Sequence, residues 1–369
     1  MKVLITGGAG FIGSHLADEL LRSGYEVRVL DSLSPQVHGA EQARPGYLSA
    51  DAELLVGDLR SPDLLRRALD GVDAVCHLAS AVGVGQSMYQ IEDYVSANEL
   101  ATAALLQCLV ERPVRRLLVA SSMSIYGEGL YRDAAGRPVE AAERSAAQLR
   151  DGEWELRGAD GGPLEPAPTP ESKRPNLASV YALNKYAQER MCLIVGRAYG
   201  IPTTALRFFN VYGTRQALSN PYTGVLAIFA SRLLNDRPPL IFEDGGQRRD
   251  FVHVRDVARA CRLALEAPAA ADRVYNVGSG RSYSVRQIAE TLARTMGKAI
   301  EPEVTGRYRV GDIRHCFADM TLARQELGFE PRIGFDEGLA ELVDWLSEQI
   351  AVDRVDQATD ELARRGLVA

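Results

Sequence analysis

This chain of 369 residues opens with Met1-Lys2-Val3-Leu4-Ile5-Thr6-Gly7-Gly8-Ala9-Gly10-Phe11-Ile12-Gly13, the stretch that decides its fold. Residues 2–6 form a short apolar run, which predicts a buried strand. Gly8, Gly10 and Gly13 follow in a G-x-G-x-x-G pattern, and residues 14–23 have a helical pattern. The glycines allow a tight turn and let backbone amides approach a pyrophosphate at the helix N-terminus. The stretch therefore predicts a strand–turn–helix unit that binds a dinucleotide.

An acidic residue ends the second predicted strand, residues 26–30. Asp31 stands there, 18 residues after Gly13. A carboxylate at this place can accept hydrogen bonds from both hydroxyls of a ribose and would repel a 2′-phosphate, which favours NAD over NADP. The alternative is a glycine turn that binds nothing. The strand, the helix and the spaced acid together argue against it.

Apolar strands and helical stretches alternate from the N-terminus to about residue 120. The later predicted strands are residues 53–56, 74–78 and 116–120, and a long helical run covers residues 92–111. This alternation predicts an α/β fold, a Rossmann doubly wound parallel sheet. Ligands of such sheets lie at the carboxyl ends of the strands. Three polar segments follow strands there: Asp58-Leu59, Ala79-Ser80 and Ser121-Ser122.

The composition is that of a soluble globular protein, with 46% hydrophobic and 25% charged residues. A net charge of −7 argues against a nucleic-acid surface. No apolar run approaches the length of a membrane span, and the N-terminus leads straight into a strand, so we expect a cytoplasmic protein. The five cysteines form no C-x-x-C pair. We therefore expect reduced thiols in the core and no metal site.

The pattern predicts three regions along the chain. Residues 1–210 would form the NAD-binding Rossmann domain, with an irregular insertion at residues 127–178 that we expect to be partly ordered, as a lid. Residues 211–350 would form a smaller α/β region that binds the substrate and includes part of the sheet-side helices. Residues 351–369 would be a C-terminal tail with an exposed helix over residues 357–365.

Tyr181 and Lys185 lie four residues apart on a helix predicted over residues 177–199. The chain has only four lysines, so such a pair is not expected by chance. Positions i and i+4 share a helix face, and a nearby cation lowers the pKa of a tyrosine. The pair therefore suits acid/base catalysis. A surface tyrosine beside a solvated lysine is the alternative, and the N-terminal unit argues against it.

With these residues the chain resembles the extended short-chain dehydrogenase/reductase family, which includes the NAD-dependent nucleotide-sugar epimerases and dehydratases. The resemblance runs from residue 2 to about residue 345. It is carried by the opening stretch, Gly57-Asp58-Leu59, His77-Leu78-Ala79, Ser121-Ser122, Tyr126-Gly127, the Tyr181/Lys185 pair, Arg207-Phe208-Phe209-Asn210-Val211-Tyr212-Gly213 and Arg249-Asp250-Phe251-Val252-His253-Val254.

The resemblance implies a role for each matched residue. Tyr181 would be the acid/base, Lys185 would bond the nicotinamide ribose, and Ser122 would bond the sugar hydroxyl. NAD would be held by Gly7, Gly10, Phe11, Ile12, Gly13, Asp31, Asp58, Leu59, Leu78, Ala79, Ser80, Asn98, Ser121, Tyr181 and Lys185. The nucleotide sugar would be held by Ser122, Asn210, Tyr222, Val225, Ile241, Phe242, Arg249 and Arg309. The two arginines would bind its diphosphate, Asp58 and Leu59 would hold adenine, and Asn98 would order the site.

The position after Ser122 separates two reactions of the family. Dehydratases carry Asp-Glu there, whereas this chain has Met123 and Ser124, which cannot transfer the protons of an elimination. We therefore expect 4-epimerisation, in which C4 is oxidised to a ketone and reduced again from the other face. The family also pairs subunits through two long helices, here residues 92–111 and 177–199, which predicts a homodimer with a four-helix bundle.

The substrate is expected to be a dTDP- or UDP-linked sugar. Residues 215–225 and the end of the insertion are similar to bacterial dTDP-L-rhamnose 4-epimerases, and Val82, Val84 and Met123 would suit the methyl group of a 6-deoxy sugar. Arginines of the insertion could instead supply a cation for a uronate: Arg132, Arg137 and Arg144. The alternatives are therefore a UDP-hexose or UDP-glucuronate 4-epimerase, a net nucleotide-ketosugar reductase, and an NAD-sensing binding protein.

Overall fold

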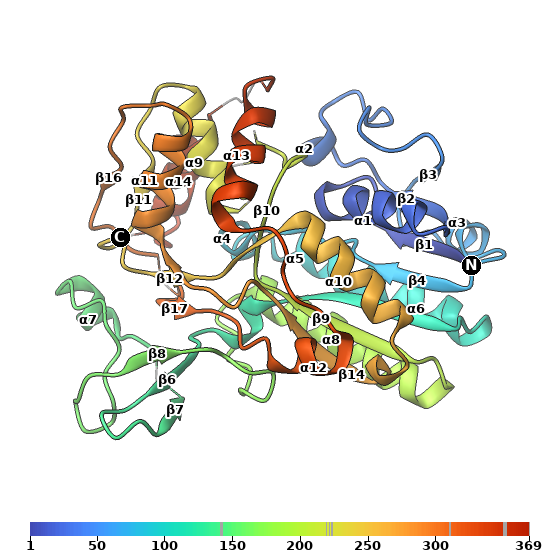
Figure 1. Ribbon diagram of the computed structural model, residues 1–369, viewed down its shortest axis with the longest axis horizontal. Helices are drawn as coiled ribbons and strands as arrows, with labels where there is room; N and C mark the ends of the chain where they lie inside the picture. The colour runs from blue at the N-terminus through green and yellow to red at the C-terminus, as the bar shows by residue number, and fades with distance from the viewer. Residues whose placement is uncertain are drawn as a thin grey trace.

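A parallel seven-stranded sheet is the centre of the computed structural model, which describes residues 1–140, 143–218, 220, 222, 224–309, 311–349 and 353–368 (Figure 1). Residues 219, 221 and 223 of the run discussed above, and residues 351, 352 and 369 of the tail, lie outside the described residues. The strands follow one another across the sheet in the order β14 (Arg273–Val277), β9 (Thr203–Phe208), β5 (Arg116–Ser122), β4 (Ala74–His77), β1 (Lys2–Thr6), β2 (Glu26–Asp31), β3 (Glu53–Val56). This order confirms the predicted doubly wound sheet.

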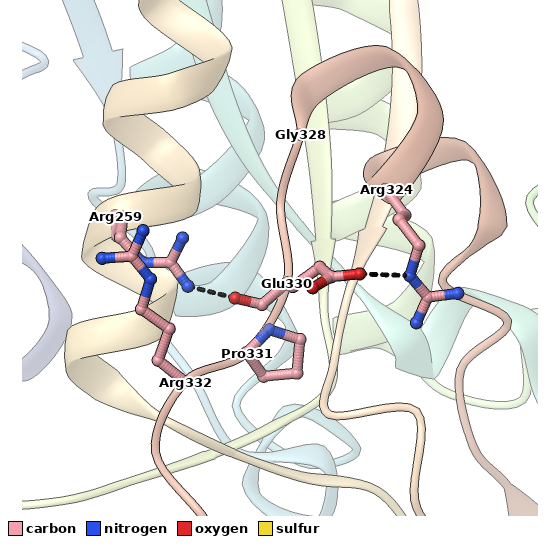
Figure 2. Close-up of a pocket in the computed structure, with 6 residues that line it drawn as sticks. All are labelled: Arg259, Arg324, Gly328, Glu330, Pro331 and Arg332. Atoms are coloured by element: carbon pink, nitrogen blue, oxygen red, sulfur yellow. Dashed lines mark hydrogen bonds and ion pairs between the residues drawn. The ribbon is translucent and has the colours of Figure 1, made fainter.

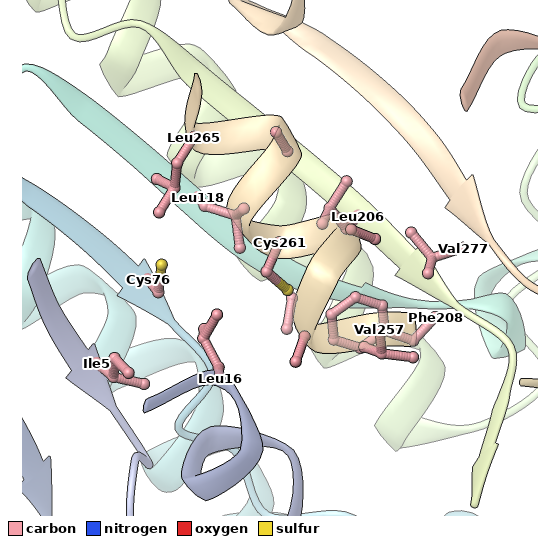
Figure 3. Close-up of a cluster of buried hydrophobic side chains, with 14 of the residues drawn as sticks. Ile5, Leu16, Cys76, Leu118, Leu206, Phe208, Val257, Cys261, Leu265 and Val277 are labelled. Atoms are coloured by element: carbon pink, nitrogen blue, oxygen red, sulfur yellow. The ribbon is translucent and has the colours of Figure 1, made fainter. Parts of the chain in front are cut away.

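The strands are apolar on both faces because helices cover the sheet on both sides. Val3 and Ile5 of β1 join one core, whereas Leu4 joins the other. Figure 3 shows the first core, in which Leu16 and Cys261 meet strand residues such as Ile5. Side chains of a strand alternate between the two faces, so one short run supplies both cores.

Helices from distant parts of the chain form the two covering layers. The first core is covered by α1 (Phe11–Arg22), α10 (Val254–Glu266) and α12 (Thr321–Leu327). The second core is covered by α3 (Pro62–Ala68), α6 (Ala101–Glu111) and α8 (Val180–Tyr199). Before α6, the predicted long helix consists of α5 (Ile91–Val95) and a π-helical segment, η1 (Ser96–Leu100).

The region after residue 210 contributes to the Rossmann layer as well as to its own core. Edge strand β14 and helix α10 both come from it, so it is not a separate body, and the boundary at residue 210 remains a prediction. A third core lies among α9 (Val225–Leu234), α11 (Val285–Thr295) and α13 (Phe335–Leu346). The smaller strand pairs here are β10 (Asn210–Tyr212) with β13 (Phe251–His253), β11 (Leu240–Ile241) with β16 (Glu303–Val304), and β12 (Arg248–Arg249) with β15 (Tyr283–Ser284) and β17 (His315–Cys316).

The insertion has more structure than its composition predicts. It contains an antiparallel sheet, in the order β7 (Pro138–Glu140), β6 (Leu130–Arg132), β8 (Glu165–Ala167), and a short helix, α7 (Ala146–Arg150). Figure 1 shows this unit extending beside the main sheet. Arg314 ties it to the C-terminal region, because its guanidinium lies 2.5 Å from Glu155 Oε1 and 3.0 Å from Glu243 Oε2. The strands are too short to show a period in the sequence.

The prediction of an exposed C-terminal helix is wrong. Helix α14 (Val355–Arg364) buries four side chains: Val355, Ala358, Thr359 and Leu362. These positions recur every three or four residues and form one apolar face. The many charges between them hid this face in the sequence. The tail is therefore packed against the rest of the protein.

All five cysteines are buried free thiols, as predicted. Burial raises the pKa of Cys76, Cys192, Cys261 and Cys316, so these thiols stay protonated. Within the described ranges, no helix is long and apolar enough to cross a membrane.

Candidate active site

The glycine turn between β1 and α1 is closely packed. Gly7 has a φ of 68°, a conformation that favours glycine. A Cβ added to Gly13 would lie 2.3 Å from the carbonyl oxygen of Gly7. Gly10 then caps α1, which begins at Phe11 with Ile12 next to it. The turn leaves no room for side chains, so a ligand can approach the backbone at the start of α1.

Asp31 lies at the carboxyl end of β2, beside this turn. Its Oδ2 accepts a hydrogen bond from the amide of Ala9 at 3.0 Å, and its Oδ1 accepts one from the amide of Leu33 at 2.9 Å. A carboxylate oxygen can accept more than one hydrogen bond. Both oxygens therefore keep capacity for ribose hydroxyls, and the turn and the acid together fit a dinucleotide.

Asp58 and Leu59 follow β3, and their side chains have different surroundings. The guanidinium of Arg60 binds the Asp58 carboxylate at 2.5 Å, and this hydrogen bond lowers the pKa of Asp58. The side chain of Leu59 is buried in the second core. Only the backbone of Leu59 can contact a ligand, so Asp58 is the exposed side chain of the pair.

Asn98 fixes the loop that follows β4. It is fully buried on the π-helical segment η1, a type of distortion that often occurs at functional sites. Its Oδ1 accepts hydrogen bonds from the Ala81 amide at 2.7 Å and from the Ser80 hydroxyl at 3.0 Å, and its Nδ2 donates to the Ala81 carbonyl oxygen at 3.1 Å. The loop that carries the predicted NAD residues Leu78, Ala79 and Ser80 is thereby held in place.

Ser122 and Tyr181 meet at the carboxyl end of β5. Ser122 is the last residue of that strand, and Tyr181 lies in the first turn of α8, whose N-cap Ser179 accepts from the Ala182 amide. Ser122 is close enough to Tyr181 to lower the pKa of its phenol by hydrogen bonding, and Ser124 Oγ donates to Ser122 Oγ at 2.8 Å. The structure thus brings two of the three predicted catalytic side chains into direct contact.

The predicted effect of Lys185 on Tyr181 is not what the structure shows. Burial raises the pKa of Tyr181, and the hydrogen bond with Ser122 opposes this only in part. Nζ of Lys185 donates to Gln188 Oε1 at 2.8 Å, and burial lowers the pKa of Lys185 to about 8. The protein alone therefore keeps the phenol protonated, because desolvation outweighs a cation that points along its own helix.

A buried hydrogen-bond network extends from Lys185 to strand β1. No role was predicted for the residues that continue it beyond Lys185. Gln188 Nε2 donates to Thr102 Oγ1 at 2.8 Å. His77 lies 2.8 Å from both Thr102 Oγ1 and Thr6 Oγ1. Burial lowers the pKa of His77 to about 3, so the ring is neutral. Its place in the His77-Leu78-Ala79 motif is the one signal that the sequence offers.

Ser121 differs from its neighbour Ser122, because adjacent side chains of a strand face opposite ways. Its hydroxyl donates to Glu189 Oε2 at 2.6 Å, and Glu189 pairs with Arg207 at 2.7 Å. The Ser121 side chain therefore belongs to a buried ion pair, and only its backbone can face the crevice.

On the predicted substrate side, Arg249 is held by backbone carbonyls. Its Nη1 donates to the carbonyl oxygen of Arg314 at 3.0 Å, and its Nη2 donates to that of Ile313. The guanidinium is thereby fixed beside the segment that follows Arg309. Arg249 is thus held by Ile313 and Arg314, which come shortly after Arg309 in the chain.

Arg309 stacks on Phe242, with its guanidinium carbon 4.3 Å from the centre of the ring. Its Nε is buried and has no hydrogen-bond partner among the described residues. Ile241, in contrast, is fully buried in the third core. Of the pair predicted to flank a base, only Phe242 can offer its side chain.

The remaining predicted substrate residues lie around the start of α9. The Asn210 side chain has a buried oxygen, Oδ1, without a partner in the described part of the chain. The hydroxyl of Tyr222 lies 2.6 Å from that of Tyr89, and Val225 is the first residue of α9. An orphaned buried oxygen costs free energy unless a ligand satisfies it.

A surface pocket of about 360 Å³ lies elsewhere, between α10 and the segment that follows α12 (Figure 2). It is lined by Arg259, Arg324, Gly328, Glu330, Pro331 and Arg332. Arg324 Nε lies 3.0 Å from Glu330 Oε1, and Arg259 donates to the Glu330 carbonyl oxygen. None of these residues is among those predicted to bind NAD or substrate.

Comparison with known proteins gives consistent matches along the chain. The sequence profile of the NAD dependent epimerase/dehydratase family matches residues 3–148 and 158–278. The dTDP-L-rhamnose 4-epimerase of Burkholderia thailandensis is 34% identical over 354 residues, which are 95% of this chain and 96% of that protein.

Two solved structures share the fold. The UDP-glucose 4-epimerase of Thermotoga maritima, solved with UDP-glucose, is 30% identical with a TM-score of 0.77, over 94% of this chain and 99% of that one. The UDP-glucuronic acid 4-epimerase of Bacillus cereus, solved with UDP-glucuronic acid and NAD, is 27% identical with a TM-score of 0.77, over the same shares.

The glycine turn and the Asp31 carboxylate fit NAD, and the matched relatives are isomerases by name. The profile match covers more than half of the chain, and the relatives cover nearly all of it. The protein therefore belongs to the NAD-dependent epimerase/dehydratase family.

Proposed function

We propose that the protein is an NAD-dependent nucleotide-sugar 4-epimerase that interconverts dTDP-L-rhamnose and dTDP-6-deoxy-L-talose. The observation that carries the proposal is the position of Ser122 at the carboxyl end of β5 with Tyr181 of α8 near it, close enough that Ser122 lowers the pKa of the phenol. It places a hydroxyl group and a phenol together, and Met123 and Ser124 directly follow Ser122 in the chain. This arrangement suits the removal and return of a hydroxyl proton.

In the proposed reaction, each catalytic side chain has one role. Tyr181 would act as a phenolate, which the positive charges of Lys185 and of bound NAD⁺ would favour against the effect of burial, and it would take the proton of the sugar hydroxyl at C4 and later return it. Ser122 donates a hydrogen bond to the same oxygen as it becomes a ketone. The glycine turn and Asp31 would hold NAD, and the bound cofactor would supply a hydride acceptor for C4 and the hydride for the return step. Lys185 would hold the nicotinamide ribose and keep a positive charge near the phenol.

The residues after Ser122 support epimerisation over dehydration. Met123 has no ionisable group, and the hydroxyl of Ser124 is used as a donor to Ser122. An elimination needs a group that removes a proton from C5 and another that protonates the leaving oxygen. Neither residue can do this at neutral pH.

The proposed substrate side combines two arginines, one aromatic ring and an orphaned amide oxygen. Arg249 and Arg309 would bind the diphosphate, because guanidinium groups suit phosphate oxygens. Phe242 would flank the base, and Asn210 would use its unpaired Oδ1. Tyr222 and Val225 would line the nucleotide at the start of α9.

The pairing of the insertion arginines supports a 6-deoxy sugar over a uronate as the substrate. The insertion arginines that could have supplied a cation are already paired: Arg144 with Glu243 at 2.8 Å, Arg137 with Asp133 at 2.8 Å, and Arg132 with the Gly136 carbonyl oxygen. Val82 and Val84 are nearly half exposed beside the loop held by Asn98. Exposed valines there suit a methyl group.

We extend the proposal to a homodimer. Helices α6 and α8 pack together, and large apolar side chains are exposed along α5, η1 and α8. These are Ile91, Val95, Leu100, Leu183 and Ile194. Apolar side chains gathered on one face mark an interaction site, and a second copy would cover them with a four-helix bundle. Light scattering at micromolar concentration should give the mass of a dimer, and a monomeric mass would contradict this part.

The test of the proposed function is a panel of dTDP- and UDP-sugars, followed by proton NMR for inversion at C4. We expect dTDP-L-rhamnose to be converted faster than UDP-glucose or UDP-glucuronate. NAD should stay bound and should not be consumed, because the hydride returns to the same carbon. Conversion of UDP-glucuronate alone would refute the sugar, and net consumption of NADH would indicate a ketosugar reductase.

A further inference from the structure

Residues 353–368, which we call the C-terminal strap, contact α9 and the loop between β4 and α5, and Figure 1 shows their helix α14 beside α9. The strap contains α14 and the residues that follow it. Four side chains of α14 are buried, so the strap packs against the rest of the protein. Its contacts fall on the elements that carry the proposed substrate residues.

An ion cluster anchors the beginning of the strap on α9. Nη1 of Arg232 lies 2.6 Å from Asp356 Oδ1, and Nη1 of Arg237 lies 2.9 Å from Asp356 Oδ2. Asp353 joins the cluster at 3.3 Å from Arg237. Arg232 is nearly buried, which strengthens its attraction to the carboxylates. The strap therefore has a fixed starting point at the C-terminal end of α9, the helix that begins at Val225.

The middle of the strap packs on α4 (Val84–Ser87). A Cβ added to Gly85 would lie 3.3 Å from both Cδ1 and Cδ2 of Leu362. Leu362 is almost fully buried. Gly85 therefore provides the space that Leu362 fills, and α4 and Val84 are held from outside by the strap.

The end of the strap reaches the two tyrosines of the proposed site. The guanidinium carbon of Arg365 lies 4.3 Å from the centre of the Tyr89 ring, and Tyr89 is hydrogen-bonded to Tyr222. Arg365 is itself paired with Glu361 at 2.6 Å. Because this pair is neutral overall, Arg365 acts as a support for the tyrosines rather than as a free cation for a uronate.

The last described residue of the strap touches the proposed diphosphate arginine. The backbone of Val368 forms an antiparallel bridge with that of Arg309. Arg309 has the unpaired Nε described above. The strap therefore holds the backbone of Arg309, and the Nε of Arg309 remains available to a ligand.

We propose that the C-terminal strap is part of the substrate site and that Leu362, Arg365 and Val368 are positioning residues for the nucleotide sugar. The inference rests on the proposed function, since it takes Tyr222 and Arg309 as substrate residues. The strap joins the β4–α5 loop of the NAD side to α9 and Arg309 of the substrate side. It lowers the cost of ordering these groups around the ligand, so its loss weakens binding of the nucleotide sugar and leaves NAD in place.

The first test compares two neighbouring arginines in the full chain. Arg365→Ala should raise the KM of the converted sugar and the Kd of dTDP or UDP by about two- to tenfold, as expected for loss of a cation–π contact. Arg364→Ala removes the same charge from an exposed position and should leave both constants unchanged. The NAD content of the purified protein, read from its absorbance after denaturation, should be equal in all three proteins.

The second test exchanges volume across the contact of Leu362 with Gly85. Leu362→Ala and Gly85→Val should each weaken binding of dTDP or UDP in calorimetry, because the first empties the contact and the second displaces the strap. The double variant should recover part of the affinity, since valine fills the space that alanine leaves. Recovery would not occur if the two variants only disturbed folding.

Two outcomes separate the strap from the proposed function. If the wild-type protein binds dTDP or UDP and all the strap variants bind it equally well, the strap is only structural and the inference is wrong. If the wild-type protein binds neither nucleotide and converts no sugar, the proposed function fails first. Loss of NAD along with nucleotide affinity in Arg365→Ala would also overturn the inference, because it would show a general loss of structure.

Discussion

The NAD side and the substrate side of this protein are built in different ways. On the NAD side, a turn of seven residues and Asp31 lie within the first 31 residues, and each is held by neighbours in adjacent strands. On the proposed substrate side, Arg309 and Tyr222 are connected by a strap from a distant part of the chain, through Val368 and through Arg365 and Tyr89. A site made of local motifs can be recognised in a sequence, whereas one made of long-range contacts cannot.

The largest expected effect is that of Tyr181→Phe, which removes the proposed acid/base group. Turnover should fall by about 10²–10⁴, the range for loss of a general acid/base. NAD should remain bound, because the variant keeps the aromatic ring at position 181 and does not alter the glycine turn. Proton NMR of C4 inversion and the NAD content of the protein measure the two effects. Substantial residual turnover would refute the role of the phenol.

Arg314→Ala tests whether the insertion is really held by the C-terminal region. Arg314 is almost fully buried between Glu155, Glu243 and Asp244, so its loss leaves uncompensated carboxylates. Breaking a buried pair costs roughly 3–5 kcal/mol, and the half-exposed Glu155 and Asp244 place the expected value at the low end. Thermal unfolding measures it, with hydrogen exchange in residues 128–155 as the local readout.

The control for that variant is Arg137→Ala. Arg137 pairs with Asp133 on the exposed surface of the insertion, so its loss should leave the melting temperature unchanged. Equal melting temperatures for both variants and the wild type would show that the insertion is not fastened through Arg314.

Ser122→Ala should have a smaller effect on turnover than Tyr181→Phe. It removes one oriented hydrogen bond to the reacting oxygen, worth about 10²–10³ in rate by analogy with an oxyanion donor. The affinity for dTDP or UDP should change little, since the nucleotide is held by other residues. A loss of nucleotide affinity with normal turnover would mean that Ser122 only positions the substrate.

Asp31→Ala tests the NAD side alone. Loss of a charged hydrogen-bond acceptor for the ribose should weaken NAD binding by about ten- to a hundredfold. NADP should lose less, because the repulsion of its 2′-phosphate disappears as well. Calorimetry with both cofactors measures the change. Unchanged discrimination between NAD and NADP would refute the contact of Asp31 with the ribose.

The sequence alone determined the sheet, the glycine turn and the Tyr181/Lys185 pair. Residues 53–56, for example, form a strand with the predicted bounds. These features have a local cause: apolar runs that need two covered faces, and glycines that alone fit a crowded turn. The family resemblance covered the same segments.

Three features could be seen only in the tertiary structure: the packing of the strap, the contacts of the insertion with the C-terminal region, and the raised pKa of Tyr181. The apolar face of α14 matters because Gly85 leaves space for Leu362, and these two residues are about three quarters of the chain length apart. The pKa of Tyr181 rises because burial outweighs Lys185, whose ammonium is taken by Gln188. Desolvation and packing contacts depend on the residues that surround a side chain in space. The neighbouring residues in the sequence do not reveal them.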